Sequence, residues 1–186
     1  MSIGYACLTI GVQNTNMKSC MIKNVNEKKL VELIQHNLNS LENIIDYNVK
    51  NHIKLFRISS DLIPFGSNLV NDIPWWDIFE YQLQTIGKKI EQSNIRVSMH
   101  PGQYTVLNSP NTLVSAKAMD DLDYHAKVLD SLGVDSRHKI ILHIGGIYNE
   151  KNHAIKRFLL NYEKLNETVK KRLVIENDDK CYNIQD

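Results

Sequence analysis

Two histidines and one glutamate have residue types and spacing that could hold a metal ion. His100, His143 and Glu176 each stand where a run rich in aliphatic residues ends. Because the carboxyl ends of parallel strands meet at one rim, we expect the three side chains to converge. Neutral imidazole and carboxylate groups suit zinc and manganese, and a carboxylate can bridge the two ions of a phosphodiesterase site. A single histidine at a strand end is more often a hydrogen-bonded rim residue, but three in register favour a metal centre.

The residues after His100 predict a protruding loop. Pro101 and Gly102 favour a tight turn, which would point the amide of Gln103 and the ring of Tyr104 outward. An amide and an aromatic ring at a loop tip are suited to unstacking a base pair or filling a gap in a duplex.

The remaining histidines and the cysteines are not expected to take part in catalysis. Five other histidines lie in predicted helices or beside the ends of predicted elements, where we expect solvated or capping roles. They are His36, His52, His125, His138 and His153. The cysteines are far apart and form no Cys-x-x-Cys pair, so they imply neither a disulfide framework nor a zinc ribbon. They are Cys7, Cys20 and Cys181.

The candidate ligands and the loop after His100 follow short β-type runs. These runs alternate with longer segments of helical periodicity. The β-type runs cover residues 3–10, 54–58, 95–99, 139–143 and 173–176. The helical segments repeat apolar residues at spacings of three and four. They cover residues 30–45, 76–90, 119–129 and 154–169. Short aliphatic strands are typical of parallel strands covered by helices, so the pattern predicts an α/β fold with five strands and four helices.

Two arrangements fit alternating βα units, a doubly wound sheet and a (β/α)8 TIM barrel. The Gly-x-Gly-x-x-Gly signature of a dinucleotide fold is missing after the first predicted strand, which favours the barrel. A complete barrel usually takes about 250 residues, which is more than this chain supplies. We therefore expect residues 1–186 to form one domain, the N-terminal part of a TIM barrel truncated after strand five. The first and fifth strands would be unpaired edges.

The composition indicates a soluble globular protein. The chain has 186 residues, of which 42% are hydrophobic and 23% are charged, and this profile allows a sizeable core. No stretch approaches the roughly 20 apolar residues of a spanning helix, and the first residues lack a secretory pattern. The expected location is therefore the cytoplasm or nucleus, without a membrane partner. Because 22 Lys and Arg nearly balance 21 Asp and Glu, any DNA partner must be held by local features or by metal ions.

Several motifs together resemble the UV damage endonuclease family. They are His100-Pro101-Gly102-Gln103-Tyr104, His143-Ile144-Gly145-Gly146, Glu176-Asn177-Asp178-Asp179, Phe56-Arg57-Ile58-Ser59-Ser60-Asp61 and Pro64-Phe65. The similarity runs in order from Gly4-Tyr5 to the end of the chain and covers the first part of a typical family member.

The resemblance implies a DNA repair enzyme. Members of the family are metal-dependent (β/α)8 enzymes, related in fold to endonuclease IV. They nick double-stranded DNA immediately 5′ of cyclobutane pyrimidine dimers and 6-4 photoproducts, usually with manganese, and so start excision repair. The metal ligands implied by position are His100, His143 and Glu176. The implied lesion contacts are Gln103 and Tyr104, as the pair inserted opposite the extruded lesion, and Tyr5, as a residue of the lesion pocket.

The sequence departs from the family pattern in two ways. After Pro64-Phe65 the family commonly has a Ser-His pair that brings another imidazole to the metals, whereas this chain has Asn68, an amide that binds metal more weakly. The Asp, His, modified Lys and Glu that complete the family's metal cluster come from later strands. The chain is therefore expected to hold part of the site.

Two other functions are compatible with these residues. A binding module or decayed gene product would keep the loop at Gln103 and Tyr104 but lack enough ligands for hydrolysis. A sugar isomerase or epimerase could place His and Glu around a divalent metal on the same barrel. The protruding loop argues against the isomerase, because a small sugar needs no wedge.

Overall fold

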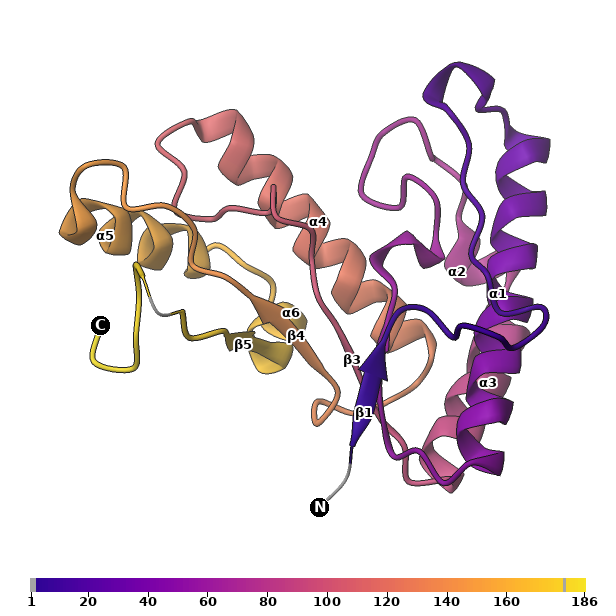
Figure 1. The fold of residues 1–186 in the computed structure, drawn as a ribbon. Helices are drawn as coiled ribbons and strands as arrows, with labels where there is room; N and C mark the ends of the chain where they lie inside the picture. The colour runs from indigo at the N-terminus through magenta and orange to yellow at the C-terminus, as the bar shows by residue number, and fades with distance from the viewer. Residues whose placement is uncertain (1–2, 179) are drawn as a thin grey trace.

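The computed structural model describes residues 3–178 and 180–186, so Asp179 of the Glu176-Asn177-Asp178-Asp179 motif lies outside the described residues. Its centre is a parallel sheet with the strand order β1-β2-β3-β4-β5 (Figure 1). The strands are β1 (Gly4–Ala6), β2 (Leu55–Ile58), β3 (Arg96–Met99), β4 (Lys139–Leu142) and β5 (Leu173–Ile175). Each strand pairs with the next one along the chain. The order lacks the reversal of a doubly wound sheet and is the order that a barrel requires.

The first strand is shorter than the predicted run of residues 3–10. Cys7 has a φ of 61°, a left-handed conformation that interrupts an extended strand. The Cys7 amide still donates to the carbonyl of Arg57, but the chain then turns away from the sheet. The prediction is wrong for residues 7–10 because their apolar side chains face solvent, and Ile10 is 94% exposed.

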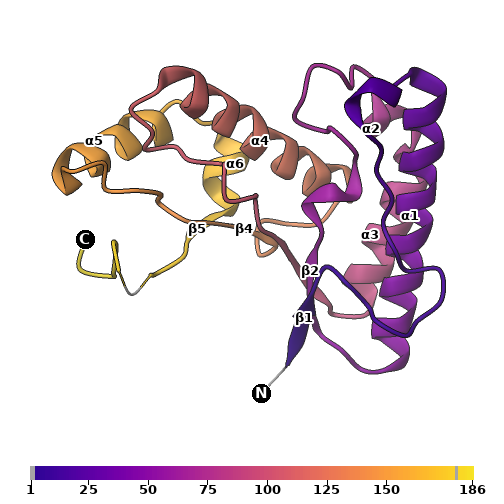
Figure 2. The ribbon, with the colours of Figure 1, turned by 45° about the horizontal axis from the view of Figure 1, so that its top comes forward.

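Helices cover the outer face of the sheet (Figures 1 and 2). The α-helices of the described residues are α1 (Glu27–Lys50), α2 (Trp75–Ile78), α3 (Glu80–Gln92), α4 (Thr112–Ser131), α5 (Lys151–Tyr162) and α6 (Glu167–Arg172). Two short 3-10 helices are η1 (Ile22–Asn24) and η2 (Ser60–Leu62). Within the described residues, none of the helices is long and apolar enough to cross a membrane.

The prediction of four helices is wrong, because two of the predicted segments are each divided. The segment 76–90 is interrupted at Phe79, which separates α2 from α3. The segment 154–169 is interrupted before α6, where Asn166 is extended with a ψ of 149°. The apolar spacing continues across this second break because Leu165 and Val169 pack into the same core as α5. Periodicity therefore predicted the buried side chains correctly but not the helix ends.

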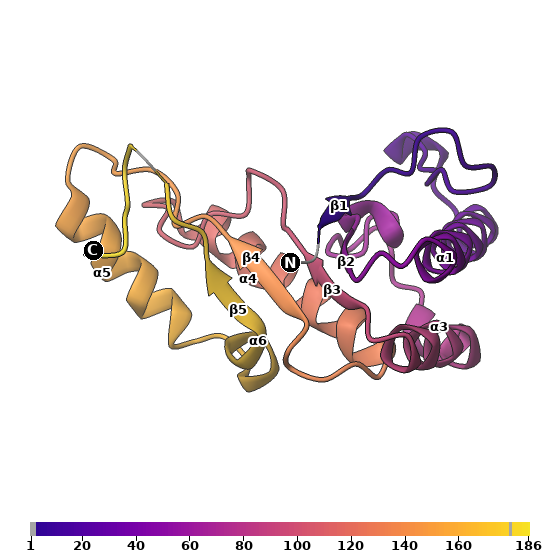
Figure 3. The same ribbon diagram turned by 60° about the horizontal axis from the view of Figure 1, so that its bottom comes forward.

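The strands from β1 to β5 form a curved sheet (Figure 3). Side chains along the strands alternate between the helix-covered face and the inner face of this sheet. Phe56 of β2 and its partner Val97 of β3 are buried against the helices. Their neighbours Arg57 and Ser98 also pair with each other and face the inner side. This alternation determines which residues after the strand ends can meet on the inner face.

Candidate metal centre

His100, His143 and Glu176 meet on the inner face, as the sequence predicts. The ligand atoms of all three residues lie within 4.8 Å of one another. His100 follows buried Met99 and His143 follows buried Leu142, so the alternation along β3 and β4 turns both rings inward. The ring centroids of the two histidines are 5.1 Å apart. Three consecutive strands thus contribute one side chain each to a compact donor set.

The carboxylate of Glu176 is the shared partner of both rings. Its Oε2 lies 2.9 Å from Nε2 of His100 and 3.6 Å from Nε2 of His143. The contact with His100 lowers the pKa of Glu176 below its usual value, so the side chain is an anion at neutral pH. An anionic oxygen beside two imidazole nitrogens is a ligand combination that divalent metal ions accept.

Hydrogen bonding determines which nitrogen of His100 can bind a metal. Nδ1 lies 2.9 Å from the carbonyl oxygen of Pro101. Since a carbonyl oxygen only accepts, Nδ1 is the donor in this contact, and Nε2, which points toward Glu176, is the nitrogen that would bind a metal ion in place of its contact with the carboxylate. Metal-bound histidines commonly donate their other N–H to a carbonyl or carboxylate in this way. The residues present therefore fit a divalent metal ion.

A second group of potential ligands lies at the amino ends of β3 and β4. It consists of Glu91, Asp135 and His138, whose ligand atoms also lie within 4.8 Å of one another. Nδ1 of His138 accepts from the backbone amide of Val97, so the neutral ring holds its proton on Nε2 and donates to Glu91. The guanidinium of Arg137 lies 2.8 Å from the carboxylate of Asp135 and forms an ion pair with it. This second group is therefore a hydrogen-bonded ion-pair network rather than a metal site.

Gln103 and Tyr104 form an exposed tip beside the first cluster. The amide of Thr105 donates to the carbonyl of Gly102 at 3.0 Å, which closes a four-residue turn with Gln103 and Tyr104 at its centre. Pro101 and Thr105 on either side of the turn are buried, whereas the side chain of Tyr104 is 82% exposed. The turn therefore projects two side chains from an anchored base.

A hollow of about 310 Å³ lies between this turn and the chain segment after β4. Gln103 and Thr105 line one side, and His143 and Gly145 line the other. Gly145 has a φ of 108°, and a Cβ there would lie 2.5 Å from Oδ1 of Asn108. The glycine therefore permits close approach of two loops, and the hollow connects the metal cluster with the exposed tip.

Two further residues singled out from the sequence lie away from this cluster. Tyr5 faces the helix layer, where its hydroxyl donates to Asn48 of α1 at 2.7 Å and its ring packs on Phe56. Asn68 is exposed, and its Oδ1 accepts from the amide of Val70 within a turn. The structure brings neither residue to the ligands, so the lesion-pocket role of Tyr5 stays a prediction.

Two of the five histidines expected to be solvated or capping are buried, and the prediction is wrong for them. His125 is 0% exposed and His138 is 3% exposed. His125 lies three residues after Leu122 and four before Leu129, both of which face the core. That spacing places His125 on the buried face of α4, which is the sequence signal that could have identified it.

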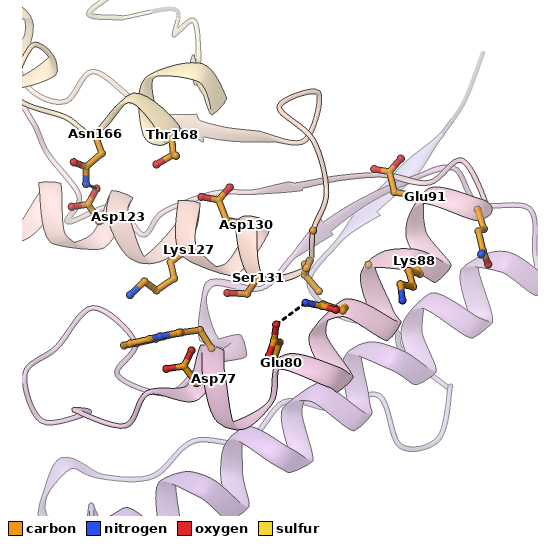
Figure 4. A pocket seen from close by; sticks show the side chains of 16 residues that line it. Asp77, Glu80, Lys88, Glu91, Asp123, Lys127, Asp130, Ser131, Asn166 and Thr168 are labelled. Atoms are coloured by element: carbon orange, nitrogen blue, oxygen red, sulfur yellow. Dashed lines mark hydrogen bonds between the residues drawn. The ribbon is translucent and has the colours of Figure 1, made fainter.

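A larger hollow of about 940 Å³ lies on the helical side of the molecule, between α3 and α4 (Figure 4). Its lining mixes carboxylates such as Asp77 and Asp130 with Lys88 and Lys127. The described residues that line it include no histidine or cysteine. It therefore does not supply the donor set found on the inner face.

Comparison with known proteins identifies the family. A protein-family model described as UV-endonuclease UvdE matches residues 1–186. The chain belongs to this family. Among curated UvdE relatives, it is 46% identical over 186 residues to the UV DNA damage endonuclease of Clostridium perfringens (strain 13 / Type A). It is 36% identical over 160 residues to the UV DNA damage endonuclease of Bacillus cereus (strain Q1). The resemblance seen in the motifs is thereby confirmed.

Solved structures confirm the TIM-barrel type of the fold. The UvdE-family chain matches the crystal structure of SacUVDE with a TM-score of 0.95 and 38% identity, over 100% of this chain. A D-psicose 3-epimerase crystallised in the presence of D-fructose matches with a TM-score of 0.53 over 77% of this chain. Its identity is 14%, so this second match concerns the fold alone.

The chain spans about half the length of the curated relatives it matches. It covers 45% of the Clostridium perfringens protein and 50% of the Bacillus cereus protein. It covers 64% of the SacUVDE chain.

Proposed function

We propose that this UvdE-family chain acts in a DNA repair endonuclease that cuts immediately 5′ of UV photoproducts. The proposed lesions are cyclobutane pyrimidine dimers and 6-4 photoproducts in double-stranded DNA. The observation that carries the proposal is the cluster of His100, His143 and Glu176 beside the exposed tip of Gln103 and Tyr104. The names of the curated relatives, UV DNA damage endonucleases, support it.

The proposed metal ion is Mn²⁺, held by His100, His143 and Glu176. A bound divalent ion supplies Lewis-acid stabilisation of the charge that develops on phosphate during hydrolysis. The protein contributes orientation, because the carbonyl of Pro101 holds the His100 ring with Nε2 toward Glu176. It also contributes charge, since Glu176 stays ionised at neutral pH.

The tip is proposed to enter the duplex at the lesion. A damaged pair stacks poorly, so extruding it costs less than the few kcal/mol needed for an intact pair. Gln103 and Tyr104 can then occupy the gap that the extruded bases leave. The formal net charge of +1 provides little general attraction to phosphate, which suits recognition of distortion rather than of the DNA backbone.

The test is to incubate the purified chain with Mn²⁺ and supercoiled plasmid, with and without UV irradiation, and to follow conversion to nicked circles. Nicking confined to irradiated plasmid, and lost in His100→Ala, is the expected result. Mapping the cut on an oligonucleotide with one dimer checks the 5′ position. Equal nicking of irradiated and intact plasmid would contradict the proposed specificity.

A damage-binding module is the second candidate. The candidate ligands do not include Gln103 or Tyr104 of the tip, and the chain spans about half of its curated relatives. Preferential binding of irradiated DNA without any nicking would favour this function over the endonuclease. The epimerase match gives no comparable support for a sugar substrate, because it concerns the fold alone.

A further inference from the structure

A hydrogen-bonded chain lies beneath the His100 end of β3. The hydroxyl of Ser60, at the start of η2, donates to the carbonyl oxygen of His100 at 2.7 Å. Nε2 of His125 lies 3.0 Å from the same hydroxyl oxygen. Nδ1 of His125 lies 2.6 Å from the carbonyl oxygen of Asp121, one helical turn earlier in α4. Three elements therefore meet at one serine hydroxyl, directly behind a proposed metal ligand.

The proton positions in this chain follow from the acceptors. Because a carbonyl oxygen only accepts, Nδ1 of His125 donates to Asp121. Burial lowers the pKa of His125, although the charge of Asp121 opposes this, and the neutral ring offers Nε2 as an acceptor. The single proton of Ser60 is therefore shared between the His100 carbonyl and the His125 ring. Both contacts hold the hydroxyl in one place.

The same turn of α4 also anchors the exposed tip and the loop after β2. The carboxylate of Asp121 accepts from the hydroxyl of Thr105 at 2.6 Å, at the base of the turn that carries the tip. The buried hydroxyl of Tyr124 donates to the carbonyl of Ser60 at 2.8 Å and accepts from the amide of Ile63. A Cβ at Gly66 would overlap the Tyr124 ring, so the loop packs closely on this helix.

We propose that Ser60 and His125 are positioning residues that hold the backbone at His100, so that its imidazole is pre-aligned for metal binding. The inference rests on the metal centre proposed above. Ser60 and His125 do not contribute ligand atoms to the cluster. They act through the carbonyl of His100, whose displacement would move the ring away from Glu176. Partners that orient a metal ligand typically change metal affinity by about 10- to 100-fold when removed.

The decisive variant is Ser60→Ala, which deletes one oxygen and leaves the volume of the site nearly unchanged. We expect the Kd for Mn²⁺, measured by titration calorimetry well below the unfolding temperature, to rise about tenfold. Ser60→Thr keeps the hydroxyl and should restore affinity to within about twofold of the wild type. Ser136→Ala, at an exposed serine, is the matched control and should leave the Kd unchanged.

A merely structural role gives a different result. If Ser60→Ala lowers the Tm but leaves the Kd for Mn²⁺ unchanged, the residue supports the fold and the proposal is wrong. His125→Phe removes both ring nitrogens while keeping a flat aromatic ring, and it should weaken Mn²⁺ binding at least as much. If His125→Phe does not fold, the comparison of Ser60→Ala with Ser60→Thr tests the proposal without it.

Hydrogen exchange separates failure of this inference from failure of the metal centre. In the metal-free chain, backbone amides in the segment 97–106 should exchange faster in Ser60→Ala than in the wild type or Ser136→Ala. A wild-type chain that binds no Mn²⁺ would overturn the metal centre, while faster exchange would still show that Ser60 holds this segment. Unchanged exchange together with an unchanged Kd would overturn the positioning role.

Discussion

The two clusters of histidine and carboxylate contain the same residue types, and one hydrogen bond distinguishes them. Nδ1 of His100 donates to a carbonyl oxygen, whereas Nδ1 of His138 accepts from a backbone amide. In the first arrangement Nδ1 holds a proton, so Nε2 can exchange its carboxylate contact for a metal ion, whereas the second arrangement requires the proton of the ring on Nε2. At the scale of single residues, the hydrogen-bond partner therefore decides which histidine can hold a metal ion.

The division between ligands and tip predicts two separable variants. His143→Ala removes one imidazole and should lower the metal bound per chain, measured by mass spectrometry after dialysis, and any DNA incision with it. Tyr104→Ala should leave metal content unchanged, because the Tyr104 side chain is exposed at the tip. It should weaken discrimination between irradiated and intact DNA in a competition assay. Loss of metal from Tyr104→Ala would show that the division of roles is wrong.

The buried ring of His138 predicts a loss of stability in mild acid. Burial lowers its pKa, with a smaller opposing effect of Glu91, so the folded chain takes up the proton at a lower pH than the unfolded chain. As the pH falls below about 6.5, this histidine is protonated in the unfolded chain before it is protonated in the folded chain. The free energy of unfolding therefore decreases until the pH falls below the pKa of His138 in the folded chain.

His138→Asn keeps an acceptor for the Val97 amide and removes the titration. Between about pH 7.5 and about pH 5.5, its Tm should fall less than that of the wild type, as followed by circular dichroism. His153→Asn, at an exposed histidine, should behave as the wild type does. Equal losses of Tm in the wild type and His138→Asn would contradict this account.

At the residue scale, strand-end position was enough to predict His100, His143 and Glu176 as neighbours. The parallel order of the strands brings consecutive carboxyl ends to one rim, whatever the loops between them do. The network around His125 could not be predicted in the same way. Its contact with Ser60 joins residues 65 positions apart, which depends on how α4 packs on the sheet.

At the scale of elements, glycine controls how closely α3 and α4 approach. A Cβ at Gly87 would overlap the backbone carbonyl oxygen of Leu132, at the end of α4. Backbone cannot rotate away as a side chain can, so the two helices must separate to admit a methyl group. Apolar spacing predicted both helical segments, but no periodic pattern indicates this contact.

Gly87→Ala should therefore destabilise the chain although alanine favours helices. The helix propensity gain is about 1 kcal/mol, whereas overpacking costs roughly 1–3 kcal/mol and is greatest against backbone. Urea unfolding should show a lower free energy of unfolding than the wild type. Gln84→Ala, at an exposed position of α3, is the control and should be neutral or slightly stabilising. A stabilised Gly87→Ala would show that α3 and α4 separate at no cost.

At the scale of the whole molecule, the sheet is open on its inner side. In the described residues β1 pairs only with β2 and β5 pairs only with β4. Apolar side chains lie exposed at both edges, including Ile3 on one side and Val174 on the other. Unpaired edges next to exposed apolar residues favour association with another chain. The alternating pattern of the sequence predicted these edges because it contained only five β-type runs.

The purified chain should therefore self-associate as its concentration rises. Sedimentation velocity is expected to show an increase in average mass, and Val174→Lys at the β5 edge should reduce that increase. Leu159→Lys, at an exposed position of α5, is the control and should not change it. A single species of monomer mass at all concentrations would contradict the prediction.

The turn from Gly102 to Thr105 also has a thermodynamic consequence for the proposed binding of DNA. Its base is buried and its closing hydrogen bond is formed, so the backbone of the tip is ordered before any DNA arrives. Ordering the backbone of a residue costs about 1–2 kcal/mol of free energy through lost conformational entropy. For the tip, this cost arises during folding and not during binding. In the proposed function, selection between damaged and intact DNA would then depend mainly on how easily the duplex deforms.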